Sequence, residues 1–208
     1  MFRRKTKIPE LPPLTPADTP HTERIMRTLD ELRELNPAEV MLVGSAALAL
    51  YGANLPQYDS LTGKSGTRPG DIDLATTGQY TDDLYQLGIS TPGGITYAER
   101  RPQDIEAEQG GPPIHSSRRR DTILQLHGLS MPVDVITGYH DGDNLQRYDD
   151  AFRRIIARNS VPLQGSAVRI ATPKYMKDHL SLRARGGDLK AQSDLRSFSQ
   201  ALLRHSGK

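Results

Sequence analysis

The chain has 208 residues, a formal net charge of +2 and a pI near 8.9. This length suffices for one substantial domain, and the mild basicity is far from that of a protein whose main task is to coat nucleic acid. Because there is no cysteine, disulfides, thiolate nucleophiles and cysteine-bound zinc are excluded. No apolar stretch approaches the length of a membrane span, so we expect a cytoplasmic protein without a membrane partner.

The N-terminal part of the sequence predicts an extended arm followed by a helix. Residues 1–18 are too rich in proline for a helix, and we expect a flexible arm there. Thr19 before Pro20 is a cap and first-turn signal, and apolar residues at helical spacing follow it. This first amphipathic helix is expected to end near Asn36.

The next segment combines a strand, a glycine and the start of a helix. Residues 40–43 predict a buried strand, and the alanine- and leucine-rich residues 45–51 favour a helix. Gly44 and Ser45 lie at the turn between them, where backbone N–H groups and the helix dipole favour an anion such as phosphate. The alternative is an ordinary helix cap, because serine and glycine are favoured there with or without an anion.

A pair of acids follows the loop expected over residues 53–70. Asp71 and Asp73 lie two residues apart on an extended segment, so both project from one face while Ile72 and Leu74 point into a core. Such a pair can bind Mg²⁺ through carboxylate oxygens. The alternative is a chance pair of acids on an exposed strand face.

The middle of the chain predicts a short helix, an irregular connection and a hairpin. We expect the helix over residues 80–87 and the irregular stretch over 88–120, which is rich in glycine, proline and charge. Residues 122–127 and 131–136 alternate between apolar and polar side chains around Gly128, which predicts two antiparallel strands.

Asp134 lies in the second strand of this predicted hairpin. Its neighbours Val133 and Val135 face the opposite side, so Asp134 is placed to supply a third carboxylate beside the acid pair. Nucleotidyl transfer needs charge neutralisation around the phosphates and an in-line acceptor hydroxyl. Taken alone, Asp134 also fits an edge-strand acid that faces solvent.

The last third of the chain is mostly helical by pattern. Apolar residues at helical spacing predict one helix, whose stripe consists of Leu145, Tyr148, Phe152, Ile155 and Ile156. A short strand over 168–170 precedes a helix that Thr172 caps and that ends at Gly186. Asp188 begins the final helix.

Together these elements predict an α/β fold in which helices flank a mixed sheet. We expect the core to span residues 19–140 and a mostly helical C-terminal region to span residues 141–208.

The order of strand, Gly-Ser, helix, paired acids and a later single acid resembles the DNA polymerase beta-like nucleotidyltransferase superfamily. Within it, the chain is most similar to the minimal AbiEii-type transferases of type IV toxin–antitoxin systems. Gly44 and Ser45 match the Gly-Ser motif of the family, Asp71 and Asp73 match its paired metal acids, and Asp134 matches its third acid. The resemblance implies a nucleotidyltransferase-type fold whose active site these residues form.

The resemblance extends to basic residues on both sides of the acids. Arg68 resembles the arginine that often precedes the acid pair, and Lys177 resembles a lysine implicated in binding nucleotide phosphates. Lys190 and Asp194 resemble the lysine and aspartate of a helix that packs beside the site. The family often has an aspartate after that lysine, whereas this chain has Ala191.

The resemblance implies a Mg²⁺-dependent enzyme that moves a nucleoside monophosphate from a nucleoside triphosphate to a hydroxyl and releases pyrophosphate. An RNA acceptor such as tRNA is favoured by the likeness to toxins, as is a cognate antitoxin, and the basic residues 118–120 agree with RNA. One alternative is a small-molecule transferase of the aminoglycoside type, for which a crowded acidic cleft would argue. Another is a catalytically degenerate nucleotide-binding regulator.

Overall fold

The computed structural model describes most of the predicted core and C-terminal region. The described residues are 19–33, 35–55, 70–77, 80, 95–100, 119–141, 144–147 and 150–205. The predicted arm at residues 1–18, Arg68 and most of the helix predicted over residues 80–87 lie outside them.

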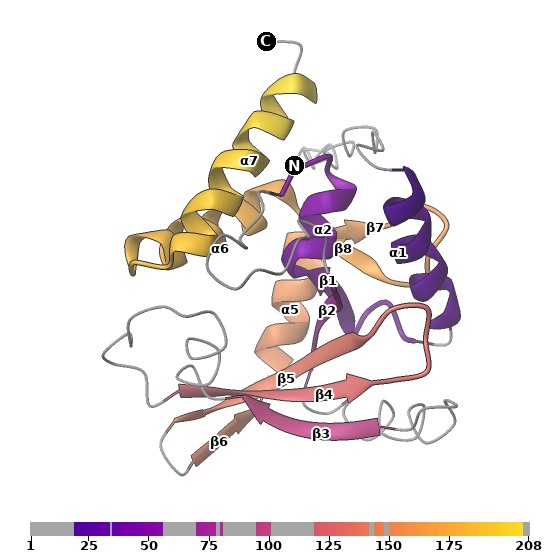
Figure 1. Cartoon of the computed structure of the whole chain (residues 1–208). Coiled ribbons are helices and arrows are strands. Elements are labelled where there is room, and N and C mark those ends of the chain that lie inside the picture. The colour runs from indigo at the N-terminus through magenta and orange to yellow at the C-terminus, as the bar shows by residue number, and fades with distance from the viewer. Residues whose placement is uncertain are drawn as a thin grey trace, which may run out of the picture.

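Five α-helices and eight strands are present in the described residues (Figure 1). The helices are α1 (Thr19–Glu31), α2 (Gly44–Leu50), α5 (Asp150–Asn159), α6 (Pro173–Arg185) and α7 (Leu189–His205). The strands are β1 (Val40–Val43), β2 (Ile72–Thr76), β3 (Ile95–Arg100), β4 (Arg119–Leu126), β5 (Val133–Asp141), β6 (Asn144–Arg147), β7 (Ser160–Pro162) and β8 (Arg169–Ala171). None of the helices described is long and apolar enough to cross a membrane.

The strands form one mixed sheet in the order β3-β4-β5-β2-β1-β8-β7, and β6 pairs with β5. β1 runs antiparallel to β2, whereas β2 runs parallel to β5 and β1 runs parallel to β8. The predicted α/β fold with a mixed sheet is therefore confirmed. β7 and β8 come from the C-terminal third, so that part of the chain contributes to the sheet as well as to the helices.

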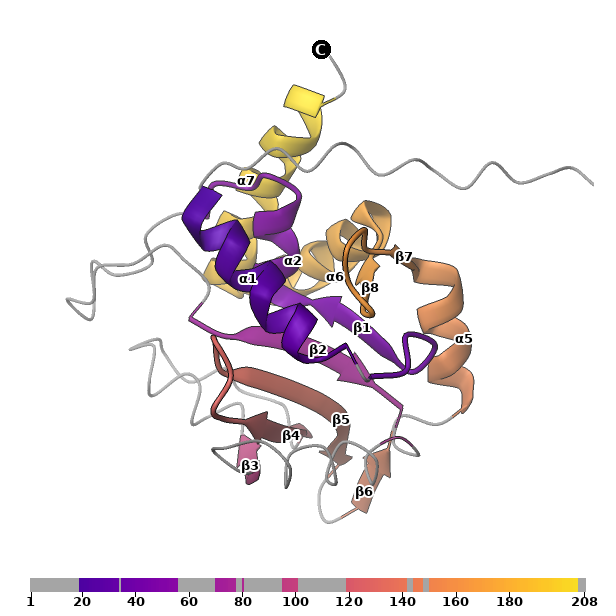
Figure 2. The same ribbon diagram turned by 90° about the vertical axis from the view of Figure 1, so that its right-hand side faces the viewer.

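The centre of the sheet is apolar because its strands are covered on both faces. Val40, Met41 and Leu42 of β1 are fully buried, as expected for a central strand whose apolar residues do not alternate with polar ones. α2 packs on β1 and β2, and α1 packs on α2; Ile25 and Leu29 of α1 are fully buried in the same core. Figure 2 shows α1 and α2 lying next to each other over these strands.

Side-chain caps define the two C-terminal helices. The backbone N–H of Tyr175 donates to Thr172 Oγ1 (3.3 Å), and Pro173 occupies the first turn of α6, as the sequence predicts. Asp188 caps α7, because its Oδ1 accepts a hydrogen bond from the backbone N–H of Ala191 (2.8 Å). α6 and α7 are therefore joined by a short turn and pack against each other.

α7 is fixed to the segment that follows α2. The ring of Phe198 is fully buried and lies 5.8 Å from the ring of Tyr51, measured between centroids. The Tyr51 hydroxyl donates to the carbonyl of Ala171 in β8 (2.8 Å), and Arg204 Nη2 donates to the carbonyl of Gly52 (3.0 Å). These contacts hold α7 against the end of α2 and, through Tyr51, against the sheet.

Three predictions of secondary structure are wrong. Leu145 does not belong to the helix that carries Phe152, because residues 144–147 form β6 and pair with the outer half of β5. The stretch predicted as irregular contains β3, and β7 was not predicted. In each case the segment forms a strand because it can hydrogen-bond to the open edge of another strand. The local sequence pattern does not show that such an edge is present.

Candidate active site

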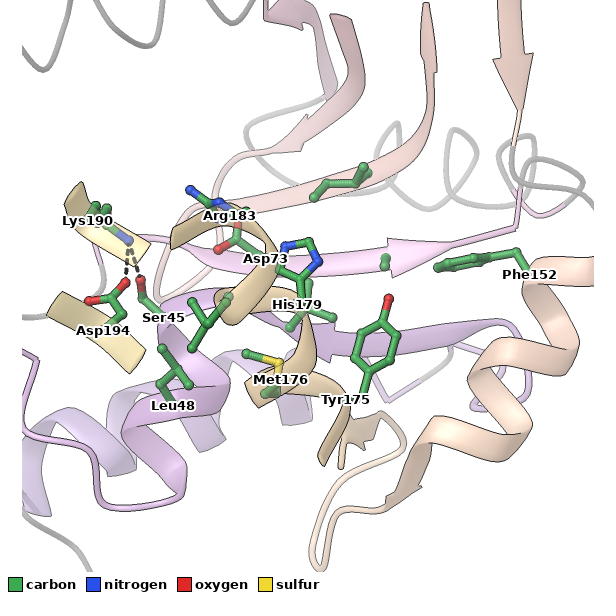
Figure 3. Close-up of a pocket in the computed structure, with 15 residues that line it drawn as sticks. Ser45, Leu48, Asp73, Phe152, Tyr175, Met176, His179, Arg183, Lys190 and Asp194 are labelled. Carbon is green, nitrogen blue, oxygen red and sulfur yellow. Dashed lines mark hydrogen bonds and ion pairs between the residues drawn. The ribbon is translucent and has the colours of Figure 1, made fainter. Parts of the chain in front are cut away.

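A solvent-open cleft of about 190 Å³ lies between the strands β1 and β2 and the helices α6 and α7 (Figure 3). Four of the predicted site residues line it, namely Gly44, Ser45, Asp73 and Lys190. Asp71, Asp134 and Lys177 are described by the structure but are not among the lining residues.

Strand register brings two of the predicted acids side by side. Asp73 of β2 is paired with Asp134 of β5, and on its other side with Val43 of β1. Directly paired residues of neighbouring strands project from the same face, so the two carboxylates share the face of the sheet that borders the cleft. Asp134 is 2% exposed, whereas Asp73 is half-buried.

Gly44 packs directly against the Asp73 carboxylate. A Cβ at residue 44 would lie 1.9 Å from Asp73 Oδ2, and the φ of Gly44 is +66°, which favours glycine. Any larger residue would therefore both strain the backbone and displace the acid. The Gly-Ser motif thus has a steric role here, separate from any role as an anion site.

Gln125 is a site residue that was not predicted from the sequence. Its Nε2 donates to Asp134 Oδ1 (3.0 Å) from the paired position on β4. The register of the hairpin could have identified Gln125. With the connection around Gly128, pairing of β4 with β5 places residue 125 opposite residue 134. The bond orients the plane of the buried Asp134 carboxylate.

Asp71 lies just before β2, which begins where the Ile72 N–H donates to the carbonyl of Pro132 (2.9 Å). In the described part of the chain, no three histidine, aspartate or glutamate side chains are grouped so as to hold a metal ion. The donor set still suits Mg²⁺, because Asp73 and Asp134 present carboxylate oxygens from paired positions. Asp73 and Asp134 could supply ligands for such an ion, whereas the structure does not group Asp71 with them as a third ligand.

Lys190 links α7 to the start of α2. Its Nζ donates to Ser45 Oγ (3.2 Å) and pairs with Asp194 Oδ2 (3.1 Å), as the dashed lines in Figure 3 show. The Asp194 side chain is 8% exposed and that of Lys190 34%. Ser45 and Lys190 are 145 residues apart in sequence, so tertiary packing alone brings them together. α2 carries no charged side chain of its own, so Lys190 supplies the positive charge beside Ser45.

α6 presents one face to the cleft and another to solvent. Tyr175, His179 and Arg183 line the cleft at spacings of four residues, whereas Lys177 is exposed and does not line it. Of these four residues, only Lys177 was predicted from the sequence as part of the site. The spacing of four residues was the signal available for the other three.

Arg183 is held by the residue that caps α7. Its Nε and Nη2 both donate to Asp188 Oδ2, at 2.8 and 2.6 Å. Burial raises the pKa of Asp188, but the hydrogen bond from the Ala191 N–H and the charges of Arg183 and Lys190 outweigh burial, so the pKa lies below its ordinary value. Asp188 therefore stays ionised at neutral pH and keeps Arg183 at the cleft.

The other end of the cleft is aromatic. Phe152 comes from α5, and the rings of Tyr175 and His179 are nearly parallel, at 17°, with centroids 6.4 Å apart. Burial raises the pKa of the Tyr175 phenol, which therefore keeps its proton at neutral pH. None of these three residues was predicted as part of the site, because they converge from two helices.

Comparison with solved structures finds weak likenesses along most of the chain. A candidate nucleotidyltransferase from Thermotoga maritima is 13% identical, with 80% of this chain and 86% of that one covered and a TM-score of 0.44. The polyadenylate synthase of Megavirus is 12% identical, with a TM-score of 0.43; the match covers 90% of this chain and 35% of that one. ANT(2″)-Ia in complex with adenylyl-2″-tobramycin is 14% identical, with 91% and 96% covered and a TM-score of 0.41.

No protein-family model and no curated protein matches the sequence. Because all three TM-scores are below 0.5, the functional assignment rests on the chain's own residues and their geometry.

Proposed function

We propose that the protein is a Mg²⁺-dependent nucleotidyltransferase that moves a nucleoside monophosphate from a nucleoside triphosphate to a hydroxyl. The observation that carries the proposal is the packing at the centre of the cleft. Gly44 lies against the Asp73 carboxylate, Asp73 is paired with Asp134, and Lys190 reaches Ser45 from α7. Two carboxylates and a lysine converge on a glycine turn, which is an arrangement suited to a metal-bound polyphosphate.

The triphosphate is proposed to lie at the polar end of the cleft. Lys190 and Arg183 supply positive charge there, and the Ser45 hydroxyl can donate to a phosphate oxygen. Lys190 pairs with Asp194 in the structure and needs only a small side-chain movement to reach a phosphate beside Ser45. Asp194 positions this lysine and limits its motion.

Asp134 is proposed to accept the proton of the attacking hydroxyl. Its carboxylate is buried beside Asp73, and Gln125 fixes its plane through Oδ1. Mg²⁺ held by Asp73 and Asp134, with Asp71 as the further ligand that the sequence resemblance implies, would neutralise the phosphate charge and help orient the triphosphate. Gly44 allows Asp73 to occupy this position, because no side chain intervenes between them.

An RNA acceptor is preferred over a small polycationic acceptor such as an aminoglycoside. The lining residues of the cleft include two acids, Asp73 and Asp194, and two cations, Arg183 and Lys190. A polycationic acceptor favours a crowded acidic cleft, and the described lining is balanced in charge. The toxin-like role and a cognate antitoxin stay predictions from the sequence resemblance.

Label transfer from α-labelled nucleoside triphosphates in the presence of Mg²⁺ tests the proposal. Asp73→Asn should lower transfer by about 10²-fold or more, because it replaces a carboxylate ligand of the proposed Mg²⁺ with a neutral amide. Asp178→Asn removes the same charge from an exposed position on α6, where the side chain is 64% exposed, and should leave transfer unchanged. Equal activity of Asp73→Asn and the parent would contradict the mechanism.

The acceptor is identified by the fate of the label. The protein is incubated with each labelled triphosphate and a cell lysate, and the label is then partitioned among RNA, protein and small molecules. Entry of label into RNA that depends on Asp73 supports the RNA assignment. Entry into small molecules alone contradicts it and favours the aminoglycoside-type alternative.

A further inference from the structure

The cleft has two chemically different ends. Ser45, Lys190 and Asp194 form the polar end, whereas Phe152 and Tyr175 lie at the opposite end in Figure 3, beyond Asp73. In the described residues, the carboxylates that line the cleft belong to the polar end and its centre. A ligand that spans the cleft would therefore meet a lysine and carboxylates able to hold Mg²⁺ at one end and aromatic faces at the other, which suits a metal-bound phosphate joined to a flat, apolar group.

The floor of the aromatic end is Ala75. It lies two residues beyond Asp73 on the same face of β2, a step of about 7 Å along the strand. Its paired neighbour on β5 is Ile136, which also lines the cleft. The small side chain of Ala75 leaves space above the sheet that α6 and α5 border with aromatic rings.

The aromatic side chains are held in place before any ligand binds. Phe152 is 9% exposed, and the next residue, Arg153, pairs with the buried Glu39 (Nε to Oε1, 2.7 Å). The Thr77 hydroxyl donates to the other oxygen of Glu39 (2.6 Å), which fixes α5 to the end of β2. The Thr172 cap fixes the backbone of Tyr175 at the start of α6, and the Tyr175 ring lies nearly parallel to that of His179.

Resting on the proposed function, we propose that the aromatic end of the cleft, formed by Phe152, Tyr175 and His179 above Ala75, is the subsite that holds the nucleobase of the triphosphate. The base is recognised by its flat faces, chiefly through the Tyr175 ring. Stacking of this kind accepts every base, because each has a π-face. The ribose then spans the step between Ala75 and Asp73, and the phosphates reach Lys190.

Isothermal titration of the full chain with two probes tests this inference. The probes are the four nucleoside triphosphates and inorganic tripolyphosphate, each with Mg²⁺. Tyr175→Leu should weaken triphosphate binding about 5- to 100-fold and leave tripolyphosphate binding unchanged, because only the nucleotide has a base to stack. Tyr175→Phe keeps the ring and should bind triphosphates as the parent does.

Each outcome decides between the subsite and its alternatives. Equal weakening of both probes by Tyr175→Leu would show a general effect on the cleft and would overturn the subsite. Unchanged triphosphate binding by that variant would overturn the subsite while the parent's binding still supports the proposed function. If the parent binds neither probe, both proposals fall. Should Tyr175→Leu fail to fold, Phe152→Leu is measured with the same two probes and interpreted in the same way.

Discussion

The two walls of the cleft are built in different ways. The sheet wall consists of Gly44 and Asp73 with Asp134 behind them. Backbone pairing along β1, β2 and β5 fixes the two aspartates, and Gly44 directly follows the last paired residue of β1. The helix wall consists of Arg183 and Lys190, which are long side chains held by capping and ion pairs at the turn between α6 and α7.

The two walls therefore suit different tasks: the sheet wall suits the chemical step and the helix wall suits substrate binding. Positions in a central strand ladder cannot shift without breaking several backbone hydrogen bonds, so the sheet wall suits groups that must meet the reacting phosphate with little freedom. The cations of the helix wall are held by part-exposed side-chain ion pairs, which cost less to break than a strand ladder, so they suit binding and release of charged ligands. Substitutions in the two walls should therefore have different effects on stability and kinetics.

Phe198→Ala should have the largest effect on stability, because this ring anchors the helix wall to Tyr51. Removing a fully buried phenylalanine leaves a cavity, and we expect a loss of about 3–5 kcal/mol in the free energy of unfolding. Urea denaturation measures it. Leu203→Ala on the same helix, where the leucine is 55% exposed, serves as the control and should stay within about 0.5 kcal/mol of the parent.

Gly44→Ala should damage the sheet wall. The new Cβ would overlap Asp73 Oδ2, so we expect a loss of about 2–4 kcal/mol in stability from strain and overpacking, together with loss of label transfer. Gly187→Ala is the matched control, because Gly187 has a φ of +94° but a Cβ there would meet no atom within 4 Å. It should cost about 1 kcal/mol and retain activity. If the two substitutions had equal effects on stability and label transfer, the steric role assigned to Gly44 would be contradicted.

Lys190→Ala should change kinetics more than stability. Loss of the charge beside Ser45 should raise the KM for the triphosphate about 10- to 100-fold, as expected for a charge-assisted hydrogen bond. Lys174→Ala on the exposed face of α6, where the side chain is 84% exposed, is the control. Steady-state kinetics at several triphosphate concentrations separates KM from kcat. An unchanged KM in Lys190→Ala would place the phosphates elsewhere.

Asp188 should give the smallest effect, and one that depends on pH. Its pKa is lowered in the folded protein, so its stabilising contribution is present above the pKa of the unfolded chain, about 4, and is lost as pH falls through the lower folded value. The Tm difference between the parent and Asp188→Asn should therefore shrink between about pH 6 and pH 3, as thermal melts would show. If the Tm difference instead grew as pH falls, the pKa of Asp188 would be raised by folding, which would contradict the assignment.

Local sequence signals predicted the parts of the fold that local physics decides. The strand at Val40–Val43, the Thr172 cap of α6 and the hairpin around Gly128 appear as expected, because capping, turn geometry and alternation act over a few residues. The helix predicted from Leu145 failed because the edge of β5 was available for pairing with it. No local pattern encodes such an edge.

The same distinction applies to the candidate site. The sheet wall was predicted because Gly44, Asp73 and Asp134 lie in recognisable short motifs. The aromatic end was missed because Phe152 and Tyr175 meet only after α5 and α6 pack on the sheet. The resemblance marks two lysines, Lys177 and Lys190, but only Lys190 lines the cleft, because the direction of a helical side chain depends on which face of the helix packs.

The most direct measurement is a crystal structure of the full chain with Mg²⁺ and a non-hydrolysable nucleoside triphosphate. The expected density has the phosphates between Ser45 and Lys190, an ion on the Asp73 and Asp134 carboxylates, and the base against Tyr175. A nucleotide bound elsewhere on the molecule, with the cleft between β2 and α6 empty, would contradict the assignment of this cleft as a nucleotidyltransferase active site.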